Sequence, residues 1–179
     1  MTDNGLIRLF LPIINAGLLA DGFTNVITQQ SNQPTMQGIN SKNTVFFYKI
    51  GDHRYGYTGK YDKWNLVHSI MTHTELQVYE TTFQISALAL QNPLTPNQYT
   101  ASDLVNEVAS IMQSDLTINT LMSQNVGILR ITDIVNPYFI DDRDNFEASP
   151  SFDFTLTYLQ TRRSVNPVIQ SVDYAIYRV

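Results

Sequence analysis

The feature that most constrains the fold of this chain is a long stretch without Gly or Pro, from Met71 to Gln91. The stretch is rich in β-branched and aromatic residues, a composition typical of a β-strand. At about 3.3 Å per residue a strand of this length spans roughly 65 Å, whereas an ordinary strand has about 5 to 6 residues. We therefore predict a central strand that is bent or split in two.

Apolar residues change parity within this predicted strand. Leu76 and Val78 occupy even positions, and the odd positions that follow hold Tyr79, Phe83, Ile85, Ala87 and Ala89. Because successive side chains point to opposite faces of a sheet, such a change turns the buried face over. Two interpretations stay open. Either the strand contains a β-bulge within one subunit, or its first half leaves its own domain and buries its other face on a neighbour.

The composition is that of one globular domain, residues 1–179. Hydrophobic residues make up 43% of the 179 residues, which is enough for a sizeable core at this length. Charged residues make up only 15%, below the roughly 25% of an average soluble protein. Asn, Gln, Ser and Thr take their place, which favours a surface suited to close contact between subunits.

Charge and Cys content exclude several classes of function. The net charge of -5 and the pI near 5.0 argue against a protein that grips nucleic acid over a broad basic face. The chain has no Cys, which excludes disulfides, a thiol nucleophile and Cys-ligated zinc. The apolar segment from Gly5 to Ala20 is a poor signal peptide and too short for a membrane span. We expect a buried helix there, with a kink or break at Pro12.

Two runs that follow residue 43 predict a β-hairpin. The run Thr44–Ile50 has apolar residues on both faces, which indicates a strand buried on both sides or at an interface. Gly51-Asp52 is predicted to turn the chain into a short second strand or aromatic loop, Arg54–Gly59. Aromatic residues gather in this region as either a hydrophobic core or the anchors of a protein interface. They are Phe46, Phe47, Tyr48, Tyr55, Tyr57, Tyr61 and Trp64.

The second half of the chain predicts two helices and further strands. A Thr-x-x-Asp capping box at Thr100–Asp103 begins an amphipathic helix, and a shorter helix follows at Leu116–Ser123. Strands are predicted at Val126–Val135, at Ser151–Gln160 until Arg162-Arg163 and Pro167 break it, and at Val168–Tyr177. Because strands joined by short turns pair antiparallel, we predict an α+β fold, a mainly antiparallel β-sheet flanked by two or three helices.

Residues that could carry chemistry are few. His73 and Glu75 share a predicted strand face, but no third group lies at a metal-ligand spacing, so a solvated face is preferred. The loop from Asp141 to Glu147 has oxygen ligands at alternate positions, as calcium loops do, but it lacks the Gly of an EF-hand loop. An ordinary acidic loop is preferred there, with a structural ion or a contact surface as alternatives. With no phosphate loop or nucleophile elbow, we expect no enzyme, no catalytic residue, no metal and no cofactor.

Several segments taken together have a distinctive order. They are an apolar N-terminal helix, Gln30–Pro34, Thr44–Ile50, Glu75–Leu90, Thr100–Asp103 and Phe152–Thr161. This order resembles the neck proteins of tailed bacteriophages, in particular the tail-terminator or gateway class. The resemblance implies a homo-oligomeric, hexameric ring that joins the head connector to the tail, terminates the tail tube and passes DNA, with the long strand or hairpin used in ring assembly. A non-enzymatic protein-binding or scaffolding domain outside a virion remains the alternative.

The resemblance also implies partners and sites. The expected partners are other copies of this chain and the neighbouring neck, connector and tail-tube or sheath proteins, with DNA only as non-specific cargo and no membrane. The expected location is the virion, after assembly in the host cytoplasm. Candidate interface residues are Phe46, Tyr48, Tyr55, Tyr57, Tyr79 and Phe83. Candidate channel-lining residues, whose negative charge would let DNA slide, are Asp141, Asp142, Asp144 and Glu147.

Overall fold

The computed structural model describes residues 1–30, 43–65, 70–89, 98–140 and 146–167. Within these residues it contains three helices, a five-stranded sheet in the order β1-β2-β3-β7-β4 and a two-stranded sheet of β5 and β6. The helices are α1 (Asp3–Ala20), α2 (Ala101–Gln113) and α3 (Asp115–Ser123). The strands are β1 (Val26–Gln30), β2 (Asn43–Asn65), β3 (Ile70–Leu88), β4 (Val126–Ile131), β5 (Tyr138–Ile140), β6 (Phe146–Ala148) and β7 (Ser151–Pro167).

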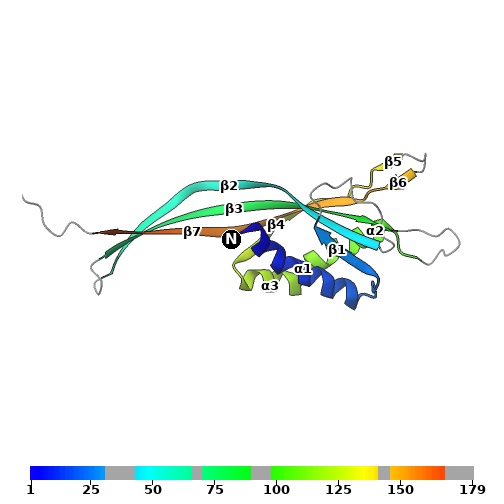
Figure 1. Cartoon of the computed structure of the whole chain (residues 1–179), viewed down its shortest axis with the longest axis horizontal. Helices are drawn as coiled ribbons and strands as arrows, with labels where there is room; N and C mark the ends of the chain where they lie inside the picture. The colour runs from blue at the N-terminus through cyan, green and yellow to red at the C-terminus, as the bar shows by residue number, and fades with distance from the viewer. Residues whose placement is uncertain (31–42, 66–69, 90–97, 141–145, 168–179) are drawn as a thin grey trace, which may run out of the picture.

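The predicted α+β class is confirmed. Strand β1 pairs parallel to β2, and the β2–β3, β3–β7 and β4–β7 pairs of the main sheet are antiparallel. The helices lie on one side of the main sheet and cover one part of its length (Figure 1). Strands β2, β3 and β7 continue past the helices as a long ribbon, which we define as residues 53–65, 70–80 and 157–167. Among the described helices, none is long and apolar enough to cross a membrane.

Local sequence signals begin the helices. The Thr2 hydroxyl oxygen caps α1 by accepting the Gly5 N–H at 3.1 Å. The predicted capping box before α2 is confirmed, because the side chains of Thr100 and Asp103 each accept the backbone N–H of the other. Helix α1 runs through Pro12 without the predicted break into two pieces. Pro12 is exposed, so water can reach the carbonyl group that loses its N–H partner.

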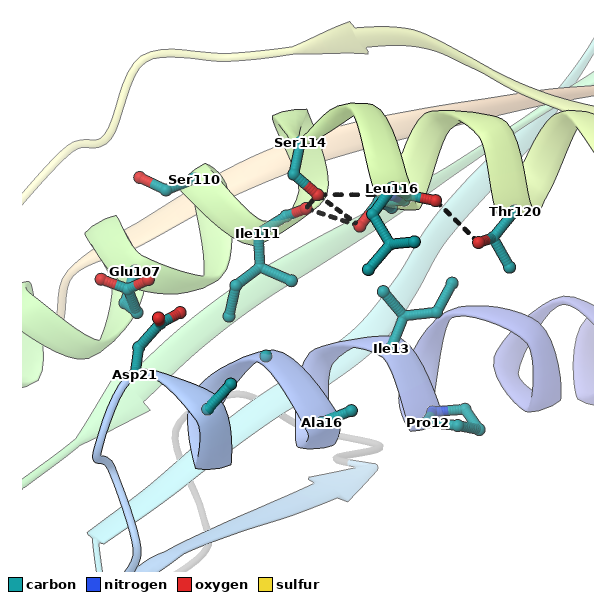
Figure 2. Close-up of a pocket in the computed structure, with 13 residues that line it drawn as sticks. Pro12, Ile13, Ala16, Asp21, Glu107, Ser110, Ile111, Ser114, Leu116 and Thr120 are labelled. Atoms are coloured by element: carbon teal, nitrogen blue, oxygen red, sulfur yellow. Dashed lines mark hydrogen bonds between the residues drawn. The ribbon is translucent and has the colours of Figure 1, made fainter.

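The helices pack on one another as well as on the sheet. Helix α1 crosses α2 closely at Gly17, where a Cβ would lie 2.7 Å from the side chain of Ile111. Beside this contact, α1 and the α2–α3 pair leave a groove of about 790 Å³ between them (Figure 2). The distance between the helices on either side of the Gly17 crossing therefore sets the width of the groove. The groove lies away from the sheet.

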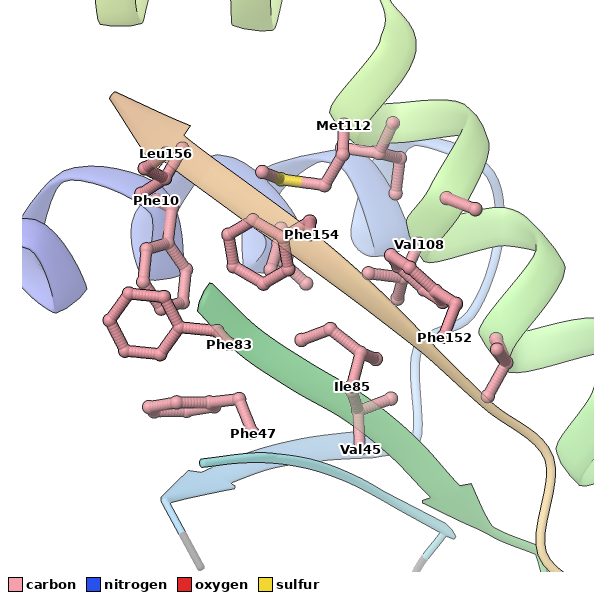
Figure 3. Packing of buried hydrophobic residues seen from close by; sticks show 14 of the residues in the cluster. Phe10, Val45, Phe47, Phe83, Ile85, Val108, Met112, Phe152, Phe154 and Leu156 are labelled. Atoms are coloured by element: carbon pink, nitrogen blue, oxygen red, sulfur yellow. The ribbon is translucent and has the colours of Figure 1, made fainter. Parts of the chain in front are cut away.

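An aromatic cluster forms the centre of the core between α1 and the sheet (Figure 3). The Phe10 ring of α1 lies 5.5 Å from Phe47, 5.1 Å from Phe83 and 5.2 Å from Phe154, all in edge-to-face geometry. Phe83 and Phe154 stack on each other at 5.5 Å. Met112 of α2 fills the same cluster and is fully buried. Such ring pairs stabilise the core beyond their buried area, so they fix the helix layer on this face of the sheet.

Strand β3 confirms the predicted central strand, although the two outer positions of the prediction, 90 and 91, lie outside the described residues. It is one strand from Ile70 to Leu88 rather than two. Its pairing with β7 runs without a register shift from Ile70↔Pro167 to Ser86↔Ser151. The described β3–β7 ladder therefore contains no β-bulge that could cause the parity change.

Strand β2 is continuous, so the predicted hairpin with a turn at Gly51-Asp52 is wrong. The register with β3 shifts between Lys49 and Gly51, as at a β-bulge. After the shift, Asp52 accepts hydrogen bonds from Lys49 at 2.5 Å and from Thr81 at 2.7 Å. These bonds tie Asp52 to both β2 and β3. The chain at Gly51-Asp52 therefore stays paired with β3 instead of turning.

A second irregularity lies further along β2, between Tyr55 and Gly59. Gly56 has a φ of +72° there, a conformation that glycine adopts at little cost. The Gln77 side-chain amide donates to the Tyr55 carbonyl oxygen at 2.8 Å, and its oxygen accepts the Thr58 hydroxyl at 2.9 Å. These bonds satisfy groups that the irregularity removes from the ladder.

The end of the chain differs from the sequence prediction in three respects. Strand β7 does not end at Arg162-Arg163 but continues to Pro167, because both Arg residues pair with β3. Strand β4 stops at Ile131, and Val135 forms only an isolated bridge. The predicted loop from Asp141 to Glu147 overlaps the short strand β6, which pairs with β5. The strand predicted at Val168–Tyr177 lies outside the described residues.

Candidate subunit interface

The main sheet has two faces of different character where it covers the helices. The helix-side face carries Phe83 and Phe154, which are completely buried. Most side chains of the outer face are polar over the same length and bond across strands, although Phe46 of β2, opposite Ser86, also lies on this face. Gln84 Nε2 donates to Asp153 Oδ1 at 2.9 Å. In this part of the molecule the sheet is amphipathic in the ordinary way, with its apolar face towards the helices.

The helix-side face becomes mainly polar once the strands pass the helices, although Met71 and Trp64 lie on it near the far end of the ribbon. Tyr79 marks the boundary, because it stacks on Tyr158 at 5.8 Å while the Arg54 guanidinium lies 5.4 Å above its ring. Further along the ribbon, His73 Nδ1 lies 2.6 Å from Asp62 Oδ1 and His73 Nε2 lies 3.6 Å from Glu75 Oε1. The hydrogen bond to Asp62 is the chief cause that raises the pKa of His73, and Glu75 adds to it. A row of charged pairs thus replaces the aromatic core.

The outer face changes in the opposite sense, because large apolar side chains appear on it in the ribbon beside polar ones such as the paired His53 and Glu80. Tyr55, Val78 and Leu159 lie opposite one another on adjacent strands, so they share this face. Leu159 is 52% exposed and Tyr55 is 63% exposed, although both are large side chains. We call this surface the outer patch, and it consists of Tyr55, Tyr61, Leu76, Val78, Leu159 and Val165.

The parity change in the sequence is this exchange of faces. Because the β3–β7 register is unbroken, Val78 points to the outer face and Phe83 to the helix side by simple alternation. The first half of β3 also extends beyond the helices (Figure 1), as the second of the two interpretations requires. An exposed apolar surface on a projecting ribbon is typical of an interaction site.

The six predicted interface residues fall into three groups. Phe83 is 0% exposed in the core and Phe46 is 4% exposed, so neither side chain offers surface to a partner. Tyr48 and Tyr79 are half-buried. Tyr48 donates its hydroxyl hydrogen to Gln84 Oε1 at 2.7 Å; burial and then the Asp153 charge raise the Tyr48 pKa.

The remaining two candidates, Tyr55 and Tyr57, are exposed side chains on the ribbon part of β2. The aromatic cluster of the sequence is therefore divided, with Phe46 and Phe47 buried and Tyr61 and Trp64 exposed. Core and surface aromatic residues follow one another along a single strand. Their separation depends on where the helices end, which the local sequence does not show.

Sequence reasoning missed the part of the outer patch that lies on β7. Leu159 and Val165 have alternate spacing with Thr161 and Arg163, so the period of two continues past Gln160. The two Arg residues predict the end of the strand, although Arg in a strand is compatible with an exposed ribbon. The continuing alternation was the signal that could have revealed this half of the patch.

Most of the predicted acidic channel loop lies outside the described residues. Asp141, Asp142 and Asp144 lie outside the described residues, and Glu147 belongs to β6, with its side chain also outside the description. In the described part of the chain, no group of three or more His, Cys, Asp or Glu residues is arranged to hold a metal ion. His73 with its two carboxylates is accordingly a hydrogen-bonded cluster of the ribbon.

A search of curated proteins found no match to this chain. A family model described as E217 gateway protein gp29 matches residues 5–168, which include all but the first two residues of α1 and every later described element to the end of β7. The match agrees with the resemblance to phage neck proteins and supports a structural role at the joint between head and tail. Because the model covers most of its length, this chain belongs to the E217 gateway protein gp29 family.

Proposed function

We propose that this chain is a structural virion protein that forms a homo-oligomeric, hexameric ring at the phage neck, where it joins the head connector to the tail, terminates the tail tube and passes DNA. Membership of the gateway family supports the location. The outer patch is the observation that carries the oligomeric part of the proposal, because it exposes large apolar side chains on a projecting ribbon.

Burial against a neighbouring subunit is the simplest way to remove the exposed apolar side chains of this ribbon from water. A sheet without a second layer has little stability of its own in water, and the helices do not extend beneath this part of β2, β3 and β7 (Figure 1). The polar helix-side face of the ribbon is already satisfied by its own charged pairs. Contact through the outer patch then buries the apolar side chains and links subunits head to tail, which closes into a ring when the rotation permits.

The channel function rests on charge. The chain has a net charge of -5. A channel wall that does not neutralise phosphates displaces no counterions from the DNA, so it does not hold the DNA. We keep Asp141, Asp142, Asp144 and Glu147 as candidates for the channel wall. Neutralising the three Asp residues should slow or stall DNA ejection while rings still assemble. Unchanged ejection would argue against a channel-facing loop.

The oligomeric part is tested by measuring mass in solution by light scattering, with negative-stain images of the same peak. The wild-type protein is expected as a ring with a central hole, and Leu159→Asp is expected to shift the mass towards the monomer. Leu129→Asp is the matched control, because Leu129 of β4 is 55% exposed against 52% for Leu159. Wild-type protein that stays monomeric at every concentration, or Leu159→Asp rings, would overturn this assignment of the outer patch.

A further inference from the structure

A groove between the helices offers a surface that complements the outer patch. It has a volume of about 790 Å³ and lies between α1 on one side and α2 with α3 on the other (Figure 2). Its walls are mostly apolar, and the side chains of Ile13 and Leu116 face each other across it. Leu116 is 76% exposed. A groove of this kind binds apolar side chains of a partner, provided that the partner also suits its polar end.

The polar end of the groove carries two carboxyl groups. Figure 2 shows Asp21 of the α1 C-terminus and Glu107 of α2 side by side there. Burial, and then a hydrogen bond with Asp21, raise the pKa of Glu107. No ion pair to either group is found among the described residues, and the sequence has no Lys or Arg in the last turn of α1. A negative charge at a helix C-terminus is unfavourable, so this end of the groove favours a cation.

Cations that fit this requirement lie on the same face of the ribbon as the outer patch. Arg163 and Lys63 lie on the outer face with Leu159 and Val78, as their pairing with Thr74 and Thr72 shows. Both are exposed, and the described part of the structure gives neither of them an ion-pair partner. Arg in particular can bond two carboxylate oxygens at once through its planar guanidinium.

The spacing of apolar and charged groups agrees on the two surfaces. Leu159 and Arg163 are four residues apart on β7, which is about 13 Å along a strand. Ile13 and Asp21 are eight residues apart on α1, which is about 12 Å along a helix. If the ribbon runs along α1 towards Asp21, with Leu159 between Ile13 and Leu116, these equal spacings bring Arg163 beside Asp21.

The two surfaces cannot meet within one subunit. The outer patch is on the face of the sheet opposite the helices, and the ribbon leads away from them (Figure 1). An arrangement in which one surface of a subunit meets a different surface of the next is heterologous, and repeated contacts of this type generate rings. The occupant that best matches the groove is therefore a second copy of this chain.

We propose that the groove between α1 and α2–α3 is the acceptor site for the outer patch of the neighbouring subunit, with Leu159 of the ribbon between Ile13 and Leu116 and Arg163 between Asp21 and Glu107. This rests on the proposed ring function and adds the surface that the ribbon contacts. Aliphatic side chains supply the buried apolar area, and the ion pair fixes the direction in which the ribbon lies.

Cross-linking tests the contact directly, because the chain has no Cys of its own. A Leu159→Cys/Leu116→Cys double variant treated with a short bismaleimide is expected to give a ladder of linked subunits on a denaturing gel. Leu129→Cys/Leu116→Cys is the matched control and should give no ladder. Each single-Cys variant can link two chains at most. Rings by light scattering without the Leu159/Leu116 ladder overturn this contact but leave the ring intact, whereas monomeric wild-type protein overturns the ring itself.

Charge exchange provides the second arm. Arg163→Glu should weaken subunit association about tenfold or more, as expected for loss of a charge pair at an interface. Arg163→Glu/Glu107→Lys should recover part of the association, because the pair with position 107 is re-formed with its signs exchanged while Asp21 keeps its negative charge. A purely structural role of either residue does not give such a rescue. Failure of the double variant to recover, with both single variants folded by circular dichroism, overturns the assignment of this ion pair.

Discussion

Replacement of Phe83 by Ala tests whether this residue belongs to the core or to a subunit interface. The side chain is 0% exposed, and its ring lies 5.1 Å from Phe10 and 5.5 Å from Phe154. Truncation of a buried Phe costs about 3–5 kcal/mol, since it removes apolar burial and leaves a cavity. That is a large part of the roughly 5–15 kcal/mol that stabilises a typical domain. At about 2–4 °C per kcal/mol for a chain of this size, we expect the Tm to fall by about 6–20 °C.

The assay is urea and thermal unfolding followed by circular dichroism. Both are best performed in a Leu159→Asp background, because subunit association adds to apparent stability and makes it depend on concentration. Tyr57→Ala is the aromatic control, and because Tyr57 is fully exposed it should change the free energy of unfolding by about 0.5 kcal/mol or less. A loss below about 1 kcal/mol for Phe83→Ala, with loss of the ring in the wild-type background, would refute the reasoning and assign Phe83 to a subunit contact.

Three further predictions concern local features. Thr100→Ala removes the capping box of α2 and should cost about 1 kcal/mol in urea unfolding. Gly17→Ala should destabilise the fold by about 1–3 kcal/mol, although Ala is the better helix former, because its Cβ would lie 2.7 Å from Ile111; a more stable variant would contradict the tight crossing. The pKa of His73 is raised above 6.5, chiefly by Asp62. Its contribution to stability is therefore full below 6.5 and is lost as pH rises through the folded-state pKa. The urea midpoint should be higher below pH 6.5 than above the folded-state pKa of His73, and Asp62→Asn should reduce this difference.

The sequence determined the features that depend on neighbours along the chain. The absence of Gly and Pro from 71 to 88 and its β-branched composition produce one long strand. The Thr100 and Asp103 side chains begin α2 through bonds within one helical turn. The change from Val78 to Tyr79 already encodes a change of buried face. These features require only local backbone preferences and the period of two, so sequence analysis predicted them together with the α+β class.

The burial and the register of these segments depend on contacts between distant parts of the chain. Gly51-Asp52 has the composition of a turn, yet it stays within β2, where Asp52 accepts hydrogen bonds from Lys49 of the same strand and from Thr81 of the paired strand β3. Phe83 and Tyr55 are both aromatic residues of β-strands, but one lies over α1 and the other lies beyond the helices. Burial depends on which distant element covers a position, and register depends on the partner strand. Neither is a property of the local sequence, which is why the exposed outer patch and the groove became visible only in the folded chain.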